Sequence, residues 1–181
     1  MDAGYLDAPD GNFSAISAGL LLKYYFSAEN KQNHQTTWRL RLNNTTYFDP
    51  LAEDGTINPT MQLLGFSVDY FLSRYFYVTG QTAFAYIGNN TGGYFSGLLG
   101  VGGQTNNFST TSLSAFSEIL VGTAGGAGLS IGDGALAEPL VGLQYAFTKT
   151  TALQTSVGYL MAVNGNFRSV VLGIGLGFMG L

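Results

Sequence analysis

Apolar side chains recur at every second position through most of this chain, and this period of two constrains the fold more than any other feature. In 168–178, for example, Leu172 and Ile174 alternate with Gly173 and Gly175. A period of two is typical of a β-strand with one apolar face. Turn-forming residues separate nine such segments, which are 13–26, 36–47, 61–72, 75–87, 93–103, 112–123, 135–147, 151–162 and 168–178. The sequence therefore predicts an all-β chain.

The charged residues within these segments help to decide whether the apolar face points inward, as in a soluble barrel, or outward, as in a membrane barrel. Only 10% of the residues are charged, whereas about 25% are charged in a typical soluble domain. A Lys or Arg on the lipid face near the bilayer midplane would cost about 2–4 kcal/mol. Six charged residues lie well inside the segments, all on the face opposite the apolar one, namely Lys23, Arg39, Arg41, Asp69, Glu118 and Glu138. This distribution favours the membrane barrel.

The rest of that opposite face also suits the inside of a small barrel. It carries mainly Gly, Ser and Ala, where a face exposed to water would carry Lys, Glu and Thr throughout. Charges in a narrow lumen of low dielectric should be paired, and three cations can pair with three anions. Aromatic residues also gather near segment ends, as at Tyr70, Phe71, Tyr75 and Phe76, which is typical of interfacial girdles. Membrane lipid is therefore the expected surrounding of the apolar face.

The chain length limits the number of strands. A transmembrane strand needs about 9–11 residues, so a single barrel domain over 1–181 has room for about eight to ten strands. The nine segments conflict with the even strand numbers of bacterial single-chain barrels. Either a glycine-rich run, most easily one within 93–134, is not a spanning strand, or residues 3–9 supply a tenth. We favour eight strands and keep ten open.

The last segment also carries a resemblance. Val170 to Phe178 reads VVLGIGLGF, an alternating strand that closes on an aromatic residue. In this pattern, and in its strand rhythm over nearly the whole length, the chain resembles the small bacterial outer-membrane β-barrels, such as the transmembrane domain of outer-membrane protein A. The resemblance implies a closed antiparallel up-and-down barrel in the outer membrane of a Gram-negative cell.

Several kinds of site are not supported by the sequence. The net charge of −4 comes with no basic patch, so we expect no nucleic-acid partner. There is no cysteine, and His34 is the single histidine, so we assign no catalytic, cofactor-binding or metal-binding residue and expect no cofactor. His34 lies in a polar turn, where a solvated side chain is the simpler interpretation. Asp49, Glu53 and Asp54 in the 48–59 loop are more typical of a solvated loop than of a cation site.

These observations lead to one preferred function and two alternatives. We expect an integral outer-membrane barrel with a structural, anchoring or surface-interaction role, a lumen closed by the six charges, and no enzyme activity. A protein partner would then bind through the loops, especially 48–59. The first alternative is a channel or transporter for small or hydrophobic molecules, which the glycines of the inner face favour because they leave space. The second is a lipid-modifying outer-membrane enzyme that uses His34.

Overall fold

The computed structural model describes residues 2–7, 14–19, 38–51, 55–57, 60–88, 93–105, 112–126 and 128–180. By their contacts, residues 1–34 and 35–181 form two compact units. In the first unit, β1 (Asp2–Asp7) pairs antiparallel with β2 (Ser14–Gly19) in a two-stranded sheet. Among the described residues, no helix is long and apolar enough to cross a membrane. A single barrel domain over 1–181 stays a prediction, because residues 20–37 lie outside the described part of the chain.

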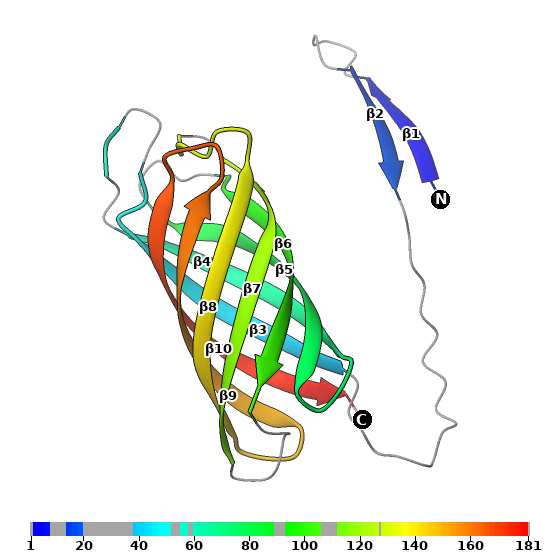
Figure 1. The fold of residues 1–181 in the computed structure, drawn as a ribbon. Helices are drawn as coiled ribbons and strands as arrows, with labels where there is room; N and C mark the ends of the chain where they lie inside the picture. The colour runs from blue at the N-terminus through cyan, green and yellow to red at the C-terminus, as the bar shows by residue number, and fades with distance from the viewer. Residues whose placement is uncertain are drawn as a thin grey trace. The chain divides into compact units, whose positions relative to one another are not determined.

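The second unit is a closed eight-stranded antiparallel barrel (Figure 1). Each strand pairs with its neighbours in the sequence, and the last strand pairs with the first to close the sheet. The favoured prediction of an eight-stranded up-and-down barrel is therefore confirmed. The strands are β3 (Trp38–Phe48), β4 (Thr60–Phe71), β5 (Phe76–Ile87), β6 (Phe95–Gln104), β7 (Leu113–Gly125), β8 (Ala135–Ala146), β9 (Thr151–Ala162) and β10 (Arg168–Gly180).

The nine alternating segments exceed the eight barrel strands by one, and neither of the two explanations that we considered for the odd number is correct. The segments in 93–134 do supply spanning strands, β6 and β7, so the expectation that a glycine-rich run would drop out is wrong. Residues 3–9 do not add a tenth barrel strand either, because β1 pairs with β2. The segment missing from the closed sheet is the first, 13–26, of which the structure describes 14–19 as β2. The inward-facing Gly100 and Gly102 of β6 are compatible with a strand because the side chains of Leu120 and Tyr77 fill the space beside them.

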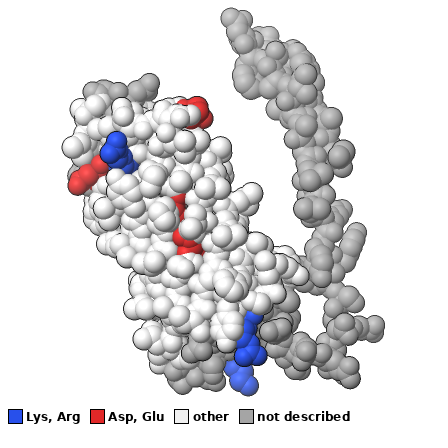
Figure 2. Space-filling model, in the orientation of Figure 1, with Lys and Arg blue, Asp and Glu red and all other residues white. Residues whose placement is uncertain are grey.

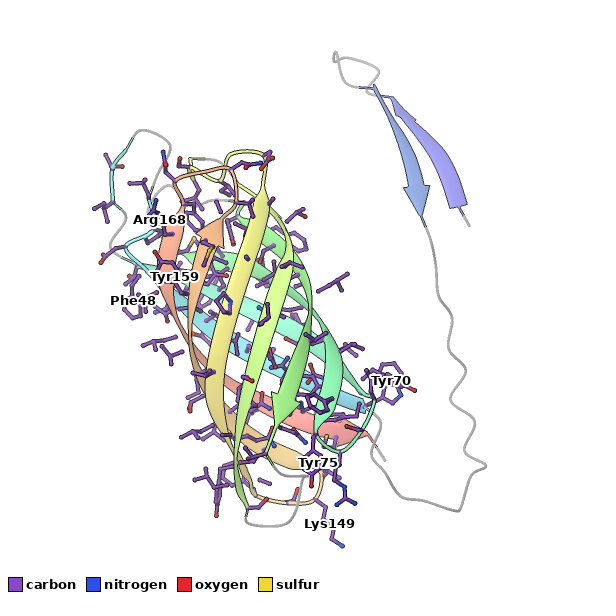
Figure 3. All side chains as sticks on the ribbon, viewed as in Figure 1. Phe48, Tyr70, Tyr75, Lys149, Tyr159 and Arg168 are labelled. Carbon is purple, nitrogen blue, oxygen red and sulfur yellow. The ribbon has the colours of Figure 1, made fainter. Side chains whose placement is uncertain are left out.

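The two faces of the barrel differ as the alternation predicts. Large apolar side chains such as Leu99 and Ile119 point outward and are exposed all around the wall. We call this exposed band the apolar belt. On the face shown in Figure 2, Lys and Arg side chains lie only near the two ends of the barrel. Tyr159 and Phe48 lie toward one end, and Tyr70 and Tyr75 toward the other (Figure 3), as expected for aromatic girdles at the two interfaces.

The two ends of the barrel differ in their connections. At the turn end, where β3 begins and β10 finishes, 72–75 and 147–150 are tight turns, and a longer connection, 105–112, joins β6 to β7. At the opposite end, which we call the loop end, the longer connections 49–59 and 126–134 occur. Outer-membrane barrels have short turns on the periplasmic side and longer loops outside. Since two of the three connections at the turn end are tight, we expect the turn end to be the periplasmic end.

Inside the barrel, the loop-end half is an apolar core that the sequence did not lead us to expect. Leu63, Leu98, Leu120 and Leu160 are fully buried there, and they pack in one cluster with Phe167. Leu129 and Ile131 of the 126–134 loop belong to the same cluster. The lumen at this end is therefore filled by packed apolar side chains from the wall and from a loop.

Aromatic rings cover inward-facing glycines on neighbouring strands. An ideal Cβ on Gly142 would lie only 2.4 Å from Cζ of the Phe116 ring and 2.4 Å from the Thr155 backbone oxygen. Similarly, the Tyr77 ring occupies the space beside Gly102. These two inner glycines therefore make room for large rings.

This packing predicts that Gly142→Val lowers the free energy of unfolding by about 1–3 kcal/mol, the usual cost of overpacking a core. The matched control is Gly97→Val on β6, because Gly97 faces outward and its Cβ would meet nothing within 4 Å. Urea-induced unfolding in lipid vesicles measures both. Equal stability of the two variants would show that Phe116 does not pack on Gly142.

Candidate functional site in the barrel lumen

Five of the six predicted lumenal charges lie within the described residues, and all five point into the barrel. Arg39 and Arg41 lie on β3, Asp69 on β4, Glu118 on β7 and Glu138 on β8. None is more than 4% exposed. Their inward direction follows from the period of two, because alternate positions of a strand share one face. The sixth predicted member, Lys23, lies outside the described residues.

Asp69 is the centre of the ion pairs. It lies directly opposite Arg39 across the β3–β4 pair, and its Oδ2 accepts a hydrogen bond from Arg39 Nε at 2.5 Å. Its Oδ1 accepts one from Arg41 Nη2 at 2.8 Å. Arg41 Nη1 then lies 2.8 Å from Glu118 Oε1. Four charges from three strands thus form a continuous buried chain of alternating sign.

Neutral side chains extend this chain around the barrel wall. Tyr77 donates its hydroxyl hydrogen to Glu118 at 2.6 Å, and the guanidinium of Arg39 lies over the Tyr77 ring at 4.7 Å. Arg39 Nη1 donates to Gln144 Oε1 at 2.7 Å. Gln154 donates to the same oxygen at 2.6 Å. These four charges and their neutral partners, which also include Thr79 and Gln104, are called the lumenal network below.

The sequence analysis did not identify the neutral members of the lumenal network as part of a site. Thr79, Gln144 and Gln154 follow the same alternation as the charges, so their inward direction was visible in the sequence. What the period of two does not give is the position of a side chain around the barrel circumference. Gln144 meets Arg39 only because the closed sheet brings β8 opposite β3, 105 residues apart in the chain.

Glu138 lies apart from the ion pairs. Tyr47 hydrogen-bonds to its carboxylate, while its Oε2 atom has no hydrogen-bond partner. A cavity of about 30 Å³, which Glu118 and Arg41 also line, lies beside it. That volume holds about two water molecules. Together, these residues give the described interior two cations and three carboxylates. The predicted balance of three cations and three carboxylates stays a prediction, because Lys23 lies outside the described residues.

The loop end offers less as a site. Asp49 is exposed, and Glu53 and Asp54 lie outside the described residues. His34, in the first unit, also lies outside the described residues. Among the residues that the structure does describe, no group of three or more His, Asp or Glu side chains is placed to hold a metal ion.

One polar contact joins two loops at this end. Asn164 donates its amide hydrogen to Asp133 at 2.7 Å, and this hydrogen bond holds the pKa of the exposed Asp133 carboxyl below its ordinary value.

No protein-family model matches the chain, and no curated protein matches it either. Solved structures do match. The N-terminal β-barrel domain of Pseudomonas aeruginosa OprF aligns over 81% of this chain and 98% of that domain, with 16% identity and a TM-score of 0.51. Neisserial surface protein A aligns over 79% and 97%, with 15% identity and a TM-score of 0.53. The attachment invasion locus protein Ail of Yersinia pestis aligns over 81% and 100%, with 11% identity and a TM-score of 0.54.

At these identities the likeness concerns the fold. The chain has the fold of the small bacterial outer-membrane barrels, as the alternating last strand indicated. The apolar belt gives this fold a surface that lipid, not water, must cover. Together, the fold and the belt place the barrel in a bacterial outer membrane. The predicted fold and the predicted location are both confirmed.

Proposed function

We propose that this protein is a closed outer-membrane barrel with a structural, anchoring or surface-interaction role, and that it is not a pore. The observation that carries this proposal is the filled lumen. The lumenal network crosses the interior from β3 to β8 through direct contacts between Arg39 and Gln144, and the cavity beside it measures about 30 Å³. An eight-stranded barrel has an interior just wide enough for side chains to fill.

Apolar groups support closure at the loop end. Leu129 and Ile131 of the 126–134 loop are 5% exposed and pack against the fully buried Phe167. Backbone hydrogen bonds hold this loop in place, since Ser130 accepts from the Phe167 N–H and donates to Leu51. An ion that entered from this end would have to cross an apolar core, which is costly for an unpaired charge.

The transporter alternative rested on the glycines of the inner face. Rings cover two of them, because Tyr77 packs on Gly102 and Phe116 on Gly142. The space beside these two glycines is therefore occupied, which supports the closed barrel. For the enzyme alternative, His34 lies outside the described residues, and the absence of enzyme activity remains part of our proposal. A protein partner would bind at the loop end, which the longer connections form.

Replacing Arg39 and Arg41 together by Met distinguishes a structural role of the lumenal network from a role as the gate of a pore. We expect the double variant to unfold at lower temperature, because Asp69 and Glu118 lose their partners, while its conductance in planar bilayers stays at the baseline of the unaltered protein. Conductance stays low because the apolar core at the loop end is untouched. The matched control removes two exposed cations by Arg74→Gln and Lys149→Gln and should change neither property. Stepwise ion currents in the unaltered protein, or their appearance in the double variant, would contradict a closed barrel.

A further inference from the structure

The membrane-facing wall carries a groove of about 810 Å³. Its lining combines exposed side chains of the apolar belt, such as Val141 and Leu143, with smaller outward-facing residues such as Ser117. One row of outward-facing positions runs along it, and each member is the registered partner of the next on the adjacent strand. The row consists of Phe76, Gly103, Ser117, Val141, Val157 and Leu172.

Small side chains produce the groove. Gly103 and Ser117 occupy the row on β6 and β7, and the next row toward the turn end has Ala115 on β7. The rows that flank these two rows are bulky. Ile119 lies in the flanking row toward the loop end and Leu113 in the flanking row toward the turn end, and each is 62% exposed. The wall is therefore recessed between two ridges. Binding sites for small molecules commonly have volumes of about 300–1,000 Å³ and apolar linings with few polar groups.

The tilt of the strands sets the depth of the groove in the membrane. The row crosses five strand spacings of about 4.8 Å, or about 24 Å in all. With strands tilted by about 40°, it climbs about 15 Å along the barrel axis. It begins at Phe76, beside the turn end, and reaches Leu172 in the loop-end half of β10. That climb is half of a hydrocarbon core about 30 Å thick, so the groove runs from the periplasmic interface to about the bilayer midplane.

We propose that this groove binds the acyl chain of an anionic phospholipid from the periplasmic leaflet. The groove follows the curved wall across six strands, from β5 to β10. A flexible chain can follow such a path, whereas a second rigid barrel is convex and meets a convex wall only along a narrow strip. The length of the groove, one leaflet deep, matches a lipid that keeps its headgroup at the interface.

The end of the groove at the interface has the chemistry for a phosphate. Tyr75 lines the groove there, and the Arg74 guanidinium lies 5.9 Å from the centre of the Tyr75 ring. Figure 3 shows Tyr75 and Lys149 at the same end of the barrel. Arg74 and Lys149 are exposed, so both are available to an anionic headgroup, and Arg binds phosphate through paired N–H groups.

The proposal predicts a specific one-to-one lipid complex. Native mass spectrometry of the detergent-solubilised full chain, titrated with palmitoyl-oleoyl phosphatidylglycerol, measures it. Gly103→Leu combined with Ser117→Leu fills the groove and should weaken the complex by roughly tenfold. Gly103 accepts a Cβ with ordinary contacts of 3.7 Å or more, so we expect this variant to fold. The matched control, Gly97→Leu, lies on the same strand and faces outward into open space, and it should bind lipid as the unaltered chain does.

Arg74→Gln tests the contribution of the lipid headgroup separately from that of the acyl chain. It should weaken the phosphatidylglycerol complex and leave binding of the corresponding diacylglycerol, which has no phosphate, unchanged. Equal lipid binding by the unaltered, groove-filled and Gly97→Leu proteins would overturn the proposal, because lipid would then bind without using the groove. A dimer that the groove-filled variant loses would also overturn it and would make a second copy the occupant.

Discussion

Asp69→Asn should lower the free energy of unfolding by about 3–5 kcal/mol, which is the usual cost of removing one partner from a buried ion pair. Asp69 is fully buried and accepts hydrogen bonds from both Arg39 and Arg41. The Asn side chain keeps the shape but loses the charge, and it turns an N–H group toward one guanidinium. Arg39 then has no carboxylate partner among the described residues, while Arg41 keeps Glu118. Urea-induced unfolding in vesicles, followed by Trp38 fluorescence, measures the loss.

The control for this variant is Asp133→Asn. Asp133 is an exposed loop carboxylate whose partner is the neutral Asn164, so its replacement should leave the stability nearly unchanged. If Asp69→Asn is as stable as Asp133→Asn, the lumenal network does not stabilise the barrel. Our account of the interior would then be wrong, although the fold would stand.

A charge placed at the middle of the apolar belt should lower the free energy of unfolding nearly as much as Asp69→Asn does. Ile119 is the central residue of β7 and points outward. Ile119→Arg should lower the free energy of unfolding by about 2–4 kcal/mol, because a guanidinium at the bilayer midplane loses its hydration. The measurement is the same urea-induced unfolding in vesicles.

Leu113→Arg is the matched control for position along the strand. Leu113 lies on the same strand and the same face, and it is as exposed as Ile119 at 62%, but it begins β7 at the turn end. Near the interface the cost falls to about 0–1 kcal/mol. Equal effects of the two variants would mean that the outer face does not cross a bilayer.

Most of the fold could be predicted from the sequence because the period of two persists over complete strands. In β10, Leu172 and Ile174 alternate with Gly173 without interruption, so both the strand and its outward face were evident. The first segment, 13–26, misled the strand count because its alternation is as regular as that of the barrel strands. The period of two shows which residues share a face of a strand, but it does not show which other strand will pair with that strand.

The candidate site could be predicted in part. Its charged members were visible because a Lys or Arg such as Arg39 on the polar face of an apolar strand is conspicuous. Their contacts were not visible, because closure of the sheet decides which inward residues meet. The apolar half of the lumen was missed although a signal existed. Pairs such as Leu63–Leu64 and Leu120–Val121 are apolar on both faces, and such pairs place one side chain in lipid and the other in the core.

The central claim is that the outer face of the barrel meets lipid while the lumen is closed. Because the chain has no cysteine, nitroxide labels can be attached to single cysteines placed one at a time at each position of 114–121 on β7. We predict that the labels at odd positions collide often with oxygen and rarely with a water-soluble nickel chelate, as in lipid. The labels at even positions should collide rarely with both, as in a packed core. Frequent collisions with the nickel chelate at even positions would reveal an open lumen, and at odd positions a barrel outside the membrane, and either result would contradict the claim.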